Sequence, residues 1–330
     1  MKLLSIIVPV YNGEDYINRC IESLIVKNRL NLYEILIIND GSQDNTKARI
    51  HLLSNRYENI RIFNKKNGGV SEARNIGICQ SVGEYICFCD HDDEYEEGLV
   101  GKILDTIQKN NDDFMIFHRK DVKKDKVISI YNNVSVYTSD IVKYLEFDFA
   151  KGSDTYSVCN KVYKSKIINN NKILFDNNLK LCEDLVFNLS YISKCKSAKY
   201  IDGYYIRYCN EGSAIYRSYN DFFFENIKSL DYVSSQCNEI GEGVIKNIKS
   251  HLAYVSIYRI LSNQDCDNIS DSVFRLRKIN FYLKANNIYI VEGYGINKFI
   301  IKFCLRFNFY YTLYFILAQL RNKVRKNENK

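Results

Sequence analysis

Several common sequence features are missing from this 330-residue chain, and each absence excludes a class of protein. No Walker A loop, G-x-x-x-x-G-K-[ST], occurs anywhere. The G-x-G-x-x-G of a dinucleotide-binding domain is also missing after the first apolar run, where PVYNGED contains a single glycine. Any nucleotide must therefore be held in another way. The eleven cysteines include no Cys-x-x-Cys pair of zinc-site spacing. Because they are scattered and odd in number, we expect reduced, mostly buried thiols in a cytoplasmic protein.

The positive charge of the chain is concentrated at its C-terminal end. Residues 298–330 contain eight Lys or Arg and one acid, Glu328, and so carry the whole net charge of +7. Residues 1–297 therefore have no bulk basic field, and we expect no nucleic-acid partner. The segment just before the basic end, 299–320, is almost entirely apolar and aromatic, but its longest uncharged stretch is the fourteen residues 307–320. That is shorter than the ~20 residues needed to span a bilayer.

Two interpretations of the tail, residues 299–330, remain open. One is an amphipathic helix lying in a membrane surface, followed by the basic run RNKVRK at 321–326. The other is a core helix with a solvated end. Met1-Lys2 leads straight into an apolar run, so we expect no secretory signal. The first interpretation then predicts a protein that is peripheral on the cytoplasmic face of the inner membrane.

The first hundred residues alternate between apolar runs of strand length and stretches with helical spacing. The apolar runs predict strands at 3–10, 34–40, 59–63 and 84–89. The helical spacing predicts helices at 14–28, 44–53 and 71–80, the last capped by Ser71. Short alternating units of this kind predict an α/β domain with a mainly parallel sheet flanked by helices. After about residue 215 the strand signal fades, and residues 220–285 predict helices.

Polar loops follow the four predicted strands at their carboxyl ends, where ligands bind in open parallel sheets. The loops are PVYNGED at 9–15, DGS at 40–42, KKNGG at 65–69 and an acidic stretch at 90–97. We expect all four to converge on one edge of the sheet. Taken singly they have ordinary interpretations: DGS as a turn with Asp44 as a helix cap, and NGG as a loop.

The fourth loop is the most informative because six of its eight residues are acidic and it directly follows a buried strand. These acids are Asp90, Asp92, Asp93, Glu94, Glu96 and Glu97. A solvated charge run is one interpretation. Crowded carboxylates, however, repel one another and raise one another's pKa, a cost that a hard divalent cation removes. Because Mg²⁺ takes one or two carboxylates plus substrate phosphates, Asp90-x-Asp92 predicts a metal bridge to a phosphorylated ligand. The nearby lysines and Arg74 would neutralise phosphate oxygens.

Five motifs, in order along the chain, resemble those of the family 2 glycosyltransferases of the GT-A fold. They are SIIVPVYNGEDYINRCIESL (5–24), ILIINDGSQDNT (35–46), NGGVSEARNIGI (67–78), GEYICFCDHDD (83–93), and NKVYKSKI (160–167) followed by CEDLVFNLSYI (182–192). The last motif resembles the later half of bacterial members that build capsule, O-antigen and other surface glycans. The resemblance covers residues 3–215, and five ordered motifs are far more specific than any one of them.

The resemblance implies a GT-A domain over 1–215, with a nucleotide-binding half at 1–98 and an acceptor half at 99–215. A mostly helical region would follow at 216–330. It also implies an inverting transfer of a sugar from a nucleotide-diphosphate donor, usually a UDP-sugar, to a glycan or lipid-linked acceptor, with Mg²⁺ or Mn²⁺ as the cofactor. By position, the donor residues would be Pro9, Tyr11 and Glu14 in the nucleotide pocket, Asp40 at the uracil or ribose, and Gly69 and Arg74 along the donor.

The same resemblance implies the catalytic and metal-binding residues. Asp90 and Asp92 match the D-x-D motif, with Asp92 as the direct metal ligand, and Asp93 would lie beside the sugar. Asp184 matches the acid that acts as general base, and Glu183 would assist or orient it. The stretch 204–217 has no histidine of the kind that some GT-A enzymes add to the metal site. Many relatives carry a proline shortly after the acids, where this chain has Glu96-Glu97-Gly98.

Two alternatives to a glycosyltransferase are compatible with parts of the sequence. A sugar-nucleotide pyrophosphorylase on a related sheet would need a glycine-rich loop with Arg and Lys after the first strand, which PVYNGED does not supply. A non-catalytic, membrane-associated protein that binds sugar nucleotides would account for the basic tail.

Overall fold

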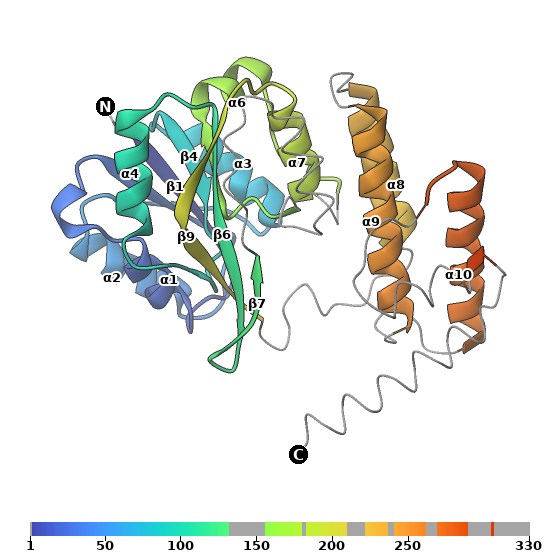
Figure 1. Ribbon diagram of the computed structural model, residues 1–330. Coiled ribbons are helices and arrows are strands. Elements are labelled where there is room, and N and C mark those ends of the chain that lie inside the picture. The colour runs from blue at the N-terminus through green and yellow to red at the C-terminus, as the bar shows by residue number, and fades with distance from the viewer. Residues whose placement is uncertain are drawn as a thin grey trace. The chain divides into compact units, whose positions relative to one another are not determined.

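The computed structural model describes residues 2–131, 156–179, 183–209, 222–236, 241–261, 269–289 and 305–306. The chain forms two compact units (Figure 1). The first comprises Met1–Tyr144 and Ser153–Asn210, and the second Leu145–Gly152 and Glu211–Lys330. The domain boundary predicted between residues 215 and 216 lies outside the described residues, so its position stays a prediction.

A nine-stranded sheet forms the centre of the first unit, in the order β3-β2-β1-β4-β8-β6-β9-β5, with β7 paired to β6 (Figure 1). The strands are β1 (Leu4–Val10), β2 (Tyr33–Asn39), β3 (Ile60–Asn64), β4 (Tyr85–Phe88), β5 (Glu94–Tyr95), β6 (Phe114–Lys123), β7 (Lys126–Tyr131), β8 (Lys161–Lys164) and β9 (Ala198–Tyr208). Every residue of β1, β2 and β4 is buried, which explains why these strands read as unbroken apolar runs.

The predicted α/β fold class is confirmed, and the parallel pairing is concentrated in the N-terminal half of the sheet. Strands β1 to β4 pair in parallel. Beyond them the sheet is mixed, because β8 runs antiparallel to both β4 and β6 whereas β6 and β9 are parallel. This mixed half extends the sheet with residues whose strand signal in the sequence is weaker.

Helices cover both faces of this sheet: α1 (Ile17–Ser23), α2 (Thr46–Arg56), α3 (Val70–Gln80), α4 (Leu99–Lys109), α6 (Ser165–Asn171) and α7 (Glu183–Ile192). Figure 1 shows α1, α2 and α4 on one side and α3, α6 and α7 on the other. The chain steps outward from β1 to β3 and then returns to β4 beside β1. Right-handed crossovers therefore place α1 and α2 opposite α3, and the reversal between β1 and β4 makes the carboxyl ends of these strands a topological switch point.

Two predictions of local structure are corrected. The helix predicted over 14–28 is the shorter α1, followed by a short 3₁₀ helix, Lys27–Arg29. Its predicted first turn is instead tied to the loop after β2, where the Glu14 N–H donates to Asp44 (3.1 Å). Helix α3 begins at Val70 with Gly69 as its N-cap, so Ser71 lies within the helix rather than capping it. Gly69 adopts φ 93°, a conformation that favours glycine.

Three long helices lie in the described residues of the second unit: α8 (Phe222–Gln236), α9 (Glu242–Leu261) and α10 (Ile269–Ala285). Their buried faces carry aliphatic side chains such as Leu230, Ile248 and Leu276. Leu305 is also buried, and its carbonyl accepts a hydrogen bond from Asn280 of α10 (3.0 Å). The rest of the tail, 299–304 and 307–330, lies outside the described residues, so its amphipathic helix stays a prediction. In the described ranges, no helix is long and apolar enough to cross a membrane.

Candidate active site

The loops after β1, β2 and β4 meet at one edge of the sheet, as their shared position at strand ends predicted. The Asn12 N–H donates to Ser42 Oγ (3.0 Å), and the Gly13 N–H donates to Thr46 Oγ1 (2.8 Å). On its other side Gly13 faces the ring of His91, where a Cβ at Gly13 would lie 2.4 Å from His91 Cδ2. A side chain at position 13 would therefore push the acidic loop away from the loop after β1.

Asp40 holds the loop after β3 in place. It is 4% exposed, and its carboxylate accepts hydrogen bonds from the N–H groups of Gly68 (2.9 Å) and Gly69 (2.8 Å). The Lys65 ammonium donates to the same carboxylate (2.5 Å) and compensates its buried charge. Asp40 thus fixes the backbone at the start of α3, and both of its oxygens already have protein partners.

Arg74 of α3 is a buried cation that joins two distant acids. Its side chain is 4% exposed, and its guanidinium contacts Asp90 (2.9 Å), at the end of β4, and Asp184 (2.7 Å), in the first turn of α7. Burial alone would lower the pKa of Arg74, but Asp184 and Asp90 raise it well above its ordinary value. The guanidinium therefore stays charged. Its Nε–H group has no hydrogen-bond acceptor among the described residues.

Glu183 and Asp184 begin α7 and lie at 4.0 Å and 2.7 Å from Nη1 of Arg74, whereas Asp90 contacts Nη2. Asp184 accepts the Val158 N–H (3.3 Å) with the oxygen that Arg74 does not contact. Burial raises the pKa of Asp184, against the lowering effect of Arg74. Burial and the neighbouring Asp184 raise the pKa of Glu183 to about 7. Both side chains remain 22% exposed, so an incoming group can reach them.

Asp93 connects the acidic loop to β9. It is 3% exposed, and its carboxylate accepts hydrogen bonds from the Tyr205 hydroxyl and the Tyr208 N–H (2.7 Å for the latter). Burial, followed by the charges of Asp92 and Asp90, raises its pKa well above the ordinary value. Arg19 of α1 reinforces this connection, because it pairs with Glu94, donates to the Asp92 carbonyl (2.9 Å) and stacks 3.8 Å over the Tyr208 ring.

Asp92 is a half-buried acid of the same loop. Burial and the nearby Asp90 raise the pKa of its carboxyl group. In the described part of the chain no cation forms an ion pair with it, since Arg19 donates to its backbone instead. No set of three or more His, Cys, Asp or Glu in the described ranges is placed to hold a metal ion. The protein therefore offers two carboxylates, Asp90 and Asp92, a donor set that fits Mg²⁺ completed by phosphate and water.

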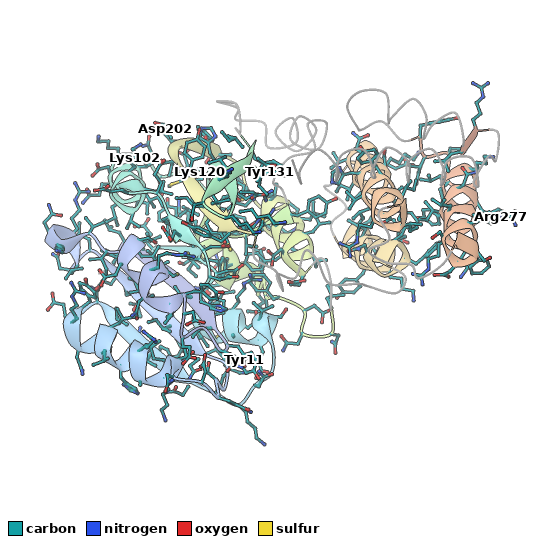
Figure 2. All side chains as sticks on the ribbon, turned by 90° about the horizontal axis from the view of Figure 1, so that it is seen from below. Tyr11, Lys102, Lys120, Tyr131, Asp202 and Arg277 are labelled. Atoms are coloured by element: carbon teal, nitrogen blue, oxygen red, sulfur yellow. The ribbon has the colours of Figure 1, made fainter. Side chains whose placement is uncertain are left out.

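The remaining predicted donor residues lie around the same edge but in different environments. Pro9 is buried within β1 and pairs with Ile38 of β2. Tyr11 is 43% exposed at the surface of the first unit (Figure 2). The Glu14 carboxylate accepts a hydrogen bond from the Asn45 N–H (2.9 Å). No heavy atom lies within 4 Å of the position that a Cβ at Gly69 would occupy. Among the predicted site residues, the Arg74 side chain contacts those of Asp90 and Asp184 directly. Glu183 Oε1 lies 4.0 Å from Arg74 Nη1.

Three comparisons with known proteins show what the chain is similar to. The family described as "Glycosyl transferase family 2" matches residues 5–169, which is half of the chain. The chain belongs to this family. It is therefore a glycosyltransferase, and neither the pyrophosphorylase nor the non-catalytic alternative is needed to explain it.

Relatives extend the similarity beyond the residues that the family matches. The uncharacterized glycosyltransferase EpsJ of Bacillus subtilis (strain 168) is 29% identical over 262 residues, 78% of this chain and 71% of EpsJ. The poly(ribitol-phosphate) beta-glucosyltransferase of Bacillus spizizenii is 29% identical over 215 residues, 62% of this chain. The match spans only 32% of that relative's own length.

Solved structures with the same fold include TarS 1–349 of S. aureus in complex with UDP-GlcNAc. It superposes with a TM-score of 0.65 over 98% of this chain and 92% of TarS 1–349, at 18% sequence identity. The complex of the same TarS segment with UDP gives a TM-score of 0.63 over the same shares of the two chains. At this identity the likeness establishes the GT-A type of fold and leaves the ligands of the present chain open.

Four residues that shape the site carried little or no signal in the sequence. Lys65 is one of two lysines in its loop, and only the structure shows that it compensates Asp40. Arg19 follows the helical spacing of α1 as an ordinary polar position. Tyr205 and Tyr208 belong to a tyrosine-rich strand, and nothing local distinguishes them from the strand's other tyrosines.

We predict that the coupling between Arg74 and Asp184 is one of the largest in the protein. Arg74→Met leaves two partly buried carboxylates without their cation and is expected to cost on the order of 3 kcal/mol of unfolding free energy. In a double-mutant cycle, Asp184→Asn should relieve part of that loss, with a coupling above ~1.5 kcal/mol. The cycle is measured by equilibrium urea unfolding.

The exposed pair Arg56–Glu22 provides the control for this cycle. Its side chains are 61% and 41% exposed at a separation of 2.6 Å, and exposed pairs couple by less than ~1 kcal/mol. Equal coupling energies for the two pairs would contradict the central position given to Arg74.

Proposed function

We propose that this glycosyltransferase inverts the anomeric centre as it moves a sugar from a UDP-sugar to a hydroxyl group of a glycan or lipid-linked acceptor. The acceptor would belong to the synthesis of a bacterial surface polysaccharide. One observation carries the proposal: the buried Arg74 joins Asp90 of the D-x-D motif to Asp184 of the later E-D pair. Two motifs far apart in the sequence are thereby held at one edge of the sheet. The UDP and UDP-GlcNAc complexes of TarS support the choice of donor.

The nucleotide would lie at the topological switch point, beyond the carboxyl ends of β1 and β4, against Pro9, Tyr11, Glu14 and Gly69. An exposed aromatic ring such as that of Tyr11 suits stacking on a base. Asp40 would contribute chiefly by holding the loop after β3. A uracil or ribose group that contacts Asp40 would take the place of the Lys65 ammonium. The N–H groups at the start of α3 suit an anionic ligand.

Asp92, assisted by Asp90, would hold Mg²⁺ or Mn²⁺. When bound, the ion would neutralise charge on the departing diphosphate. Arg74 already compensates Asp90 at 2.9 Å, so Asp92 is the carboxylate most in need of a cation. Asp93, fixed by Tyr205 and Tyr208, would keep the loop beside the sugar in one conformation.

Asp184 would act as the general base, with Glu183 beside it. Asp184 accepts the proton of the acceptor hydroxyl while that oxygen forms its bond to the anomeric carbon. The bond from that carbon to the diphosphate oxygen breaks on the opposite face, so a single displacement inverts the centre. The burial that raises the pKa of Asp184 makes it a stronger base, and Arg74 keeps it ionised.

The protein would work at the cytoplasmic face of the membrane as a peripheral protein, which suits a lipid-linked acceptor. The basic tail, 299–330, supports this location through its composition.

Two isosteric substitutions test the catalytic assignment. Asp184→Asn removes the base and is expected to lower kcat by 10²- to 10⁴-fold. Asp92→Asn is expected to abolish stimulation by Mn²⁺. Turnover is measured as UDP release across a panel of UDP-sugars and acceptors, with and without Mn²⁺.

Asp202→Asn is the matched control, because the Asp202 side chain is 84% exposed and pairs only loosely with Lys102 at 3.5 Å (Figure 2). It should keep wild-type turnover. If Asp92→Asn and Asp184→Asn also keep wild-type rates, the roles assigned to these acids are wrong.

The reaction rate should also depend on pH through the E-D pair. A general base works only when ionised, and burial raises the pKa of both acids, that of Glu183 to about 7. Glu183 has to lose its proton before it can assist Asp184 as a charged neighbour, so the rate should rise with pH through about pH 7. Glu183→Gln removes this titrating group and should remove the limb near pH 7. A kcat/KM profile of the wild type that is flat from pH 5 to 8 would argue against a role for the ionised Glu183 beside Asp184.

A further inference from the structure

Large aromatic side chains stand exposed on the outer face of α10 in the second unit. Phe274 is 56% exposed and Phe281 is 77% exposed. Residues seven positions apart lie on the same side of a helix, two turns from each other, so these two rings share one face. Lys278 lies between them, with its ammonium 4.6 Å from the centre of the Phe274 ring. The pattern of two exposed phenylalanines around a lysine differs from the aliphatic buried face of the same helix.

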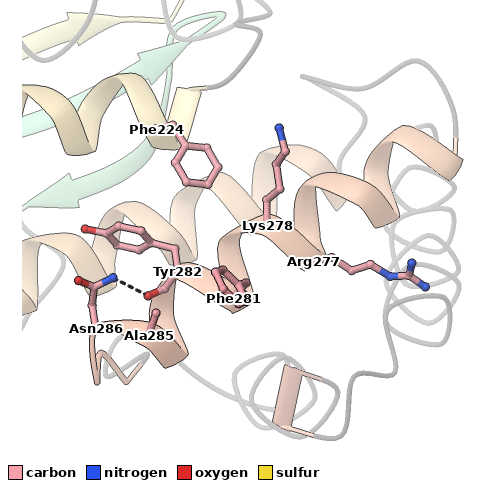
Figure 3. Close-up of a pocket in the computed structure, with 7 residues that line it drawn as sticks. All are labelled: Phe224, Arg277, Lys278, Phe281, Tyr282, Ala285 and Asn286. Atoms are coloured by element: carbon pink, nitrogen blue, oxygen red, sulfur yellow. Dashed lines mark hydrogen bonds between the residues drawn. The ribbon is translucent and has the colours of Figure 1, made fainter.

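A hollow of about 700 Å³ adjoins this face (Figure 3). Its lining residues are Phe224, Arg277, Lys278, Phe281, Tyr282, Ala285 and Asn286. Phe224 belongs to α8 and meets the Tyr282 ring edge-on at 6.2 Å, while Asn286 donates to the Tyr282 carbonyl (2.8 Å). Figure 2 shows Arg277 pointing outward from α10. The hollow is therefore aromatic inside and bordered by two basic side chains.

The charge of this stretch has one sign. Residues 272–289 contain Arg275, Arg277, Lys278 and Lys284, and no Asp or Glu. Arg275 pairs with Asp271 of the preceding turn (3.0 Å). Exposed phenylalanines combined with a predominance of basic residues are typical of helices that lie in the interface of an anionic membrane.

We propose that the α10 face, defined as Phe274, Arg277, Lys278 and Phe281, binds the surface of a membrane that contains anionic lipid. The two phenyl rings would enter the boundary between headgroups and acyl chains, and the basic side chains would contact lipid phosphates. This inference rests on the membrane location proposed above but not on the catalytic assignments. The α10 face would be a second membrane contact in addition to the tail. Within the tail, the Leu305 carbonyl accepts a hydrogen bond from Asn280 of the same helix.

The chemistry favours a lipid surface over a soluble anionic glycan. A glycan phosphate would be attracted by the same cations, but phenyl rings offer no hydrogen-bonding group to a hydrated polymer. Burying apolar surface in lipid removes it from water, which is the favourable step for these two side chains. Stable attachment generally needs two signals, and the tail and the α10 face would supply one each.

Vesicle flotation of the full-length protein tests the proposal. We expect the wild type to float with vesicles of phosphatidylcholine and phosphatidylglycerol, and to be released as salt increases, but not to float with phosphatidylcholine alone. Phe274→Ser with Phe281→Ser should weaken the partition coefficient at least tenfold. Arg277→Gln with Lys278→Gln should weaken it several-fold. Tyr232→Ser is the matched control, because Tyr232 is a 59% exposed aromatic on α8, outside the α10 face, and it should float as the wild type does.

Two results would overturn the proposal. One is flotation of the double phenylalanine variant at the wild-type level. The other is failure of the wild type to float, including the case in which it binds soluble poly(ribitol phosphate) instead. Thermal unfolding and UDP release with a soluble acceptor should be unchanged in the phenylalanine variant. Normal turnover with lost flotation would thus separate the fate of this surface from that of the active site.

Discussion

The arrangement of the first unit depends on one buried charge. The Arg74 guanidinium is almost fully removed from water, and an arginine in that position is stable only beside acids that compensate it. Asp90 and Asp184 do so from the end of β4 and the start of α7. The same contacts therefore hold α3, β4 and α7 in a fixed relation. Removing Arg74 would leave both carboxylates without their cation, whereas removing either acid would leave Arg74 with a single partner.

This constraint also explains the cluster of acids after β4. Asp90 is compensated by Arg74, Asp93 is bound by Tyr205 and by the Tyr208 N–H, and Glu94 pairs with Arg19. Three of the six carboxylates are therefore bound individually within the fold, which does not fit the interpretation of the whole cluster as a solvated charge run. Asp92 lies among these groups without an ion pair in the described part of the chain. Its raised pKa expresses the same electrostatic cost that a divalent cation would remove.

Sequence patterns predicted the features that depend on local periodicity. The apolar runs gave β1 to β4 within a residue or two, and their order along the chain gave the edge where the loops converge. Contacts between charges were not predictable, because Arg74 and Asp184 are 110 positions apart and no local rule pairs them. The role of Asp40 at the uracil or ribose stays a prediction, and the sequence did not predict that its oxygens hold Gly68, Gly69 and Lys65. The start of α3 was misplaced because the backbone at Gly69, rather than a side-chain cap, begins that helix.

The central claim is that Arg74 compensates Asp90 and Asp184 and so leaves Asp92 as the carboxylate that needs a cation. A crystal structure with Mn²⁺ and UDP, with the metal located by anomalous diffraction, tests this most directly. The account predicts that Asp92 would hold the manganese at this edge of the sheet, with Arg74 still in contact with both of its acids. A metal bound between Asp90 and Asp184 with Arg74 displaced, or no metal at this edge, would contradict it.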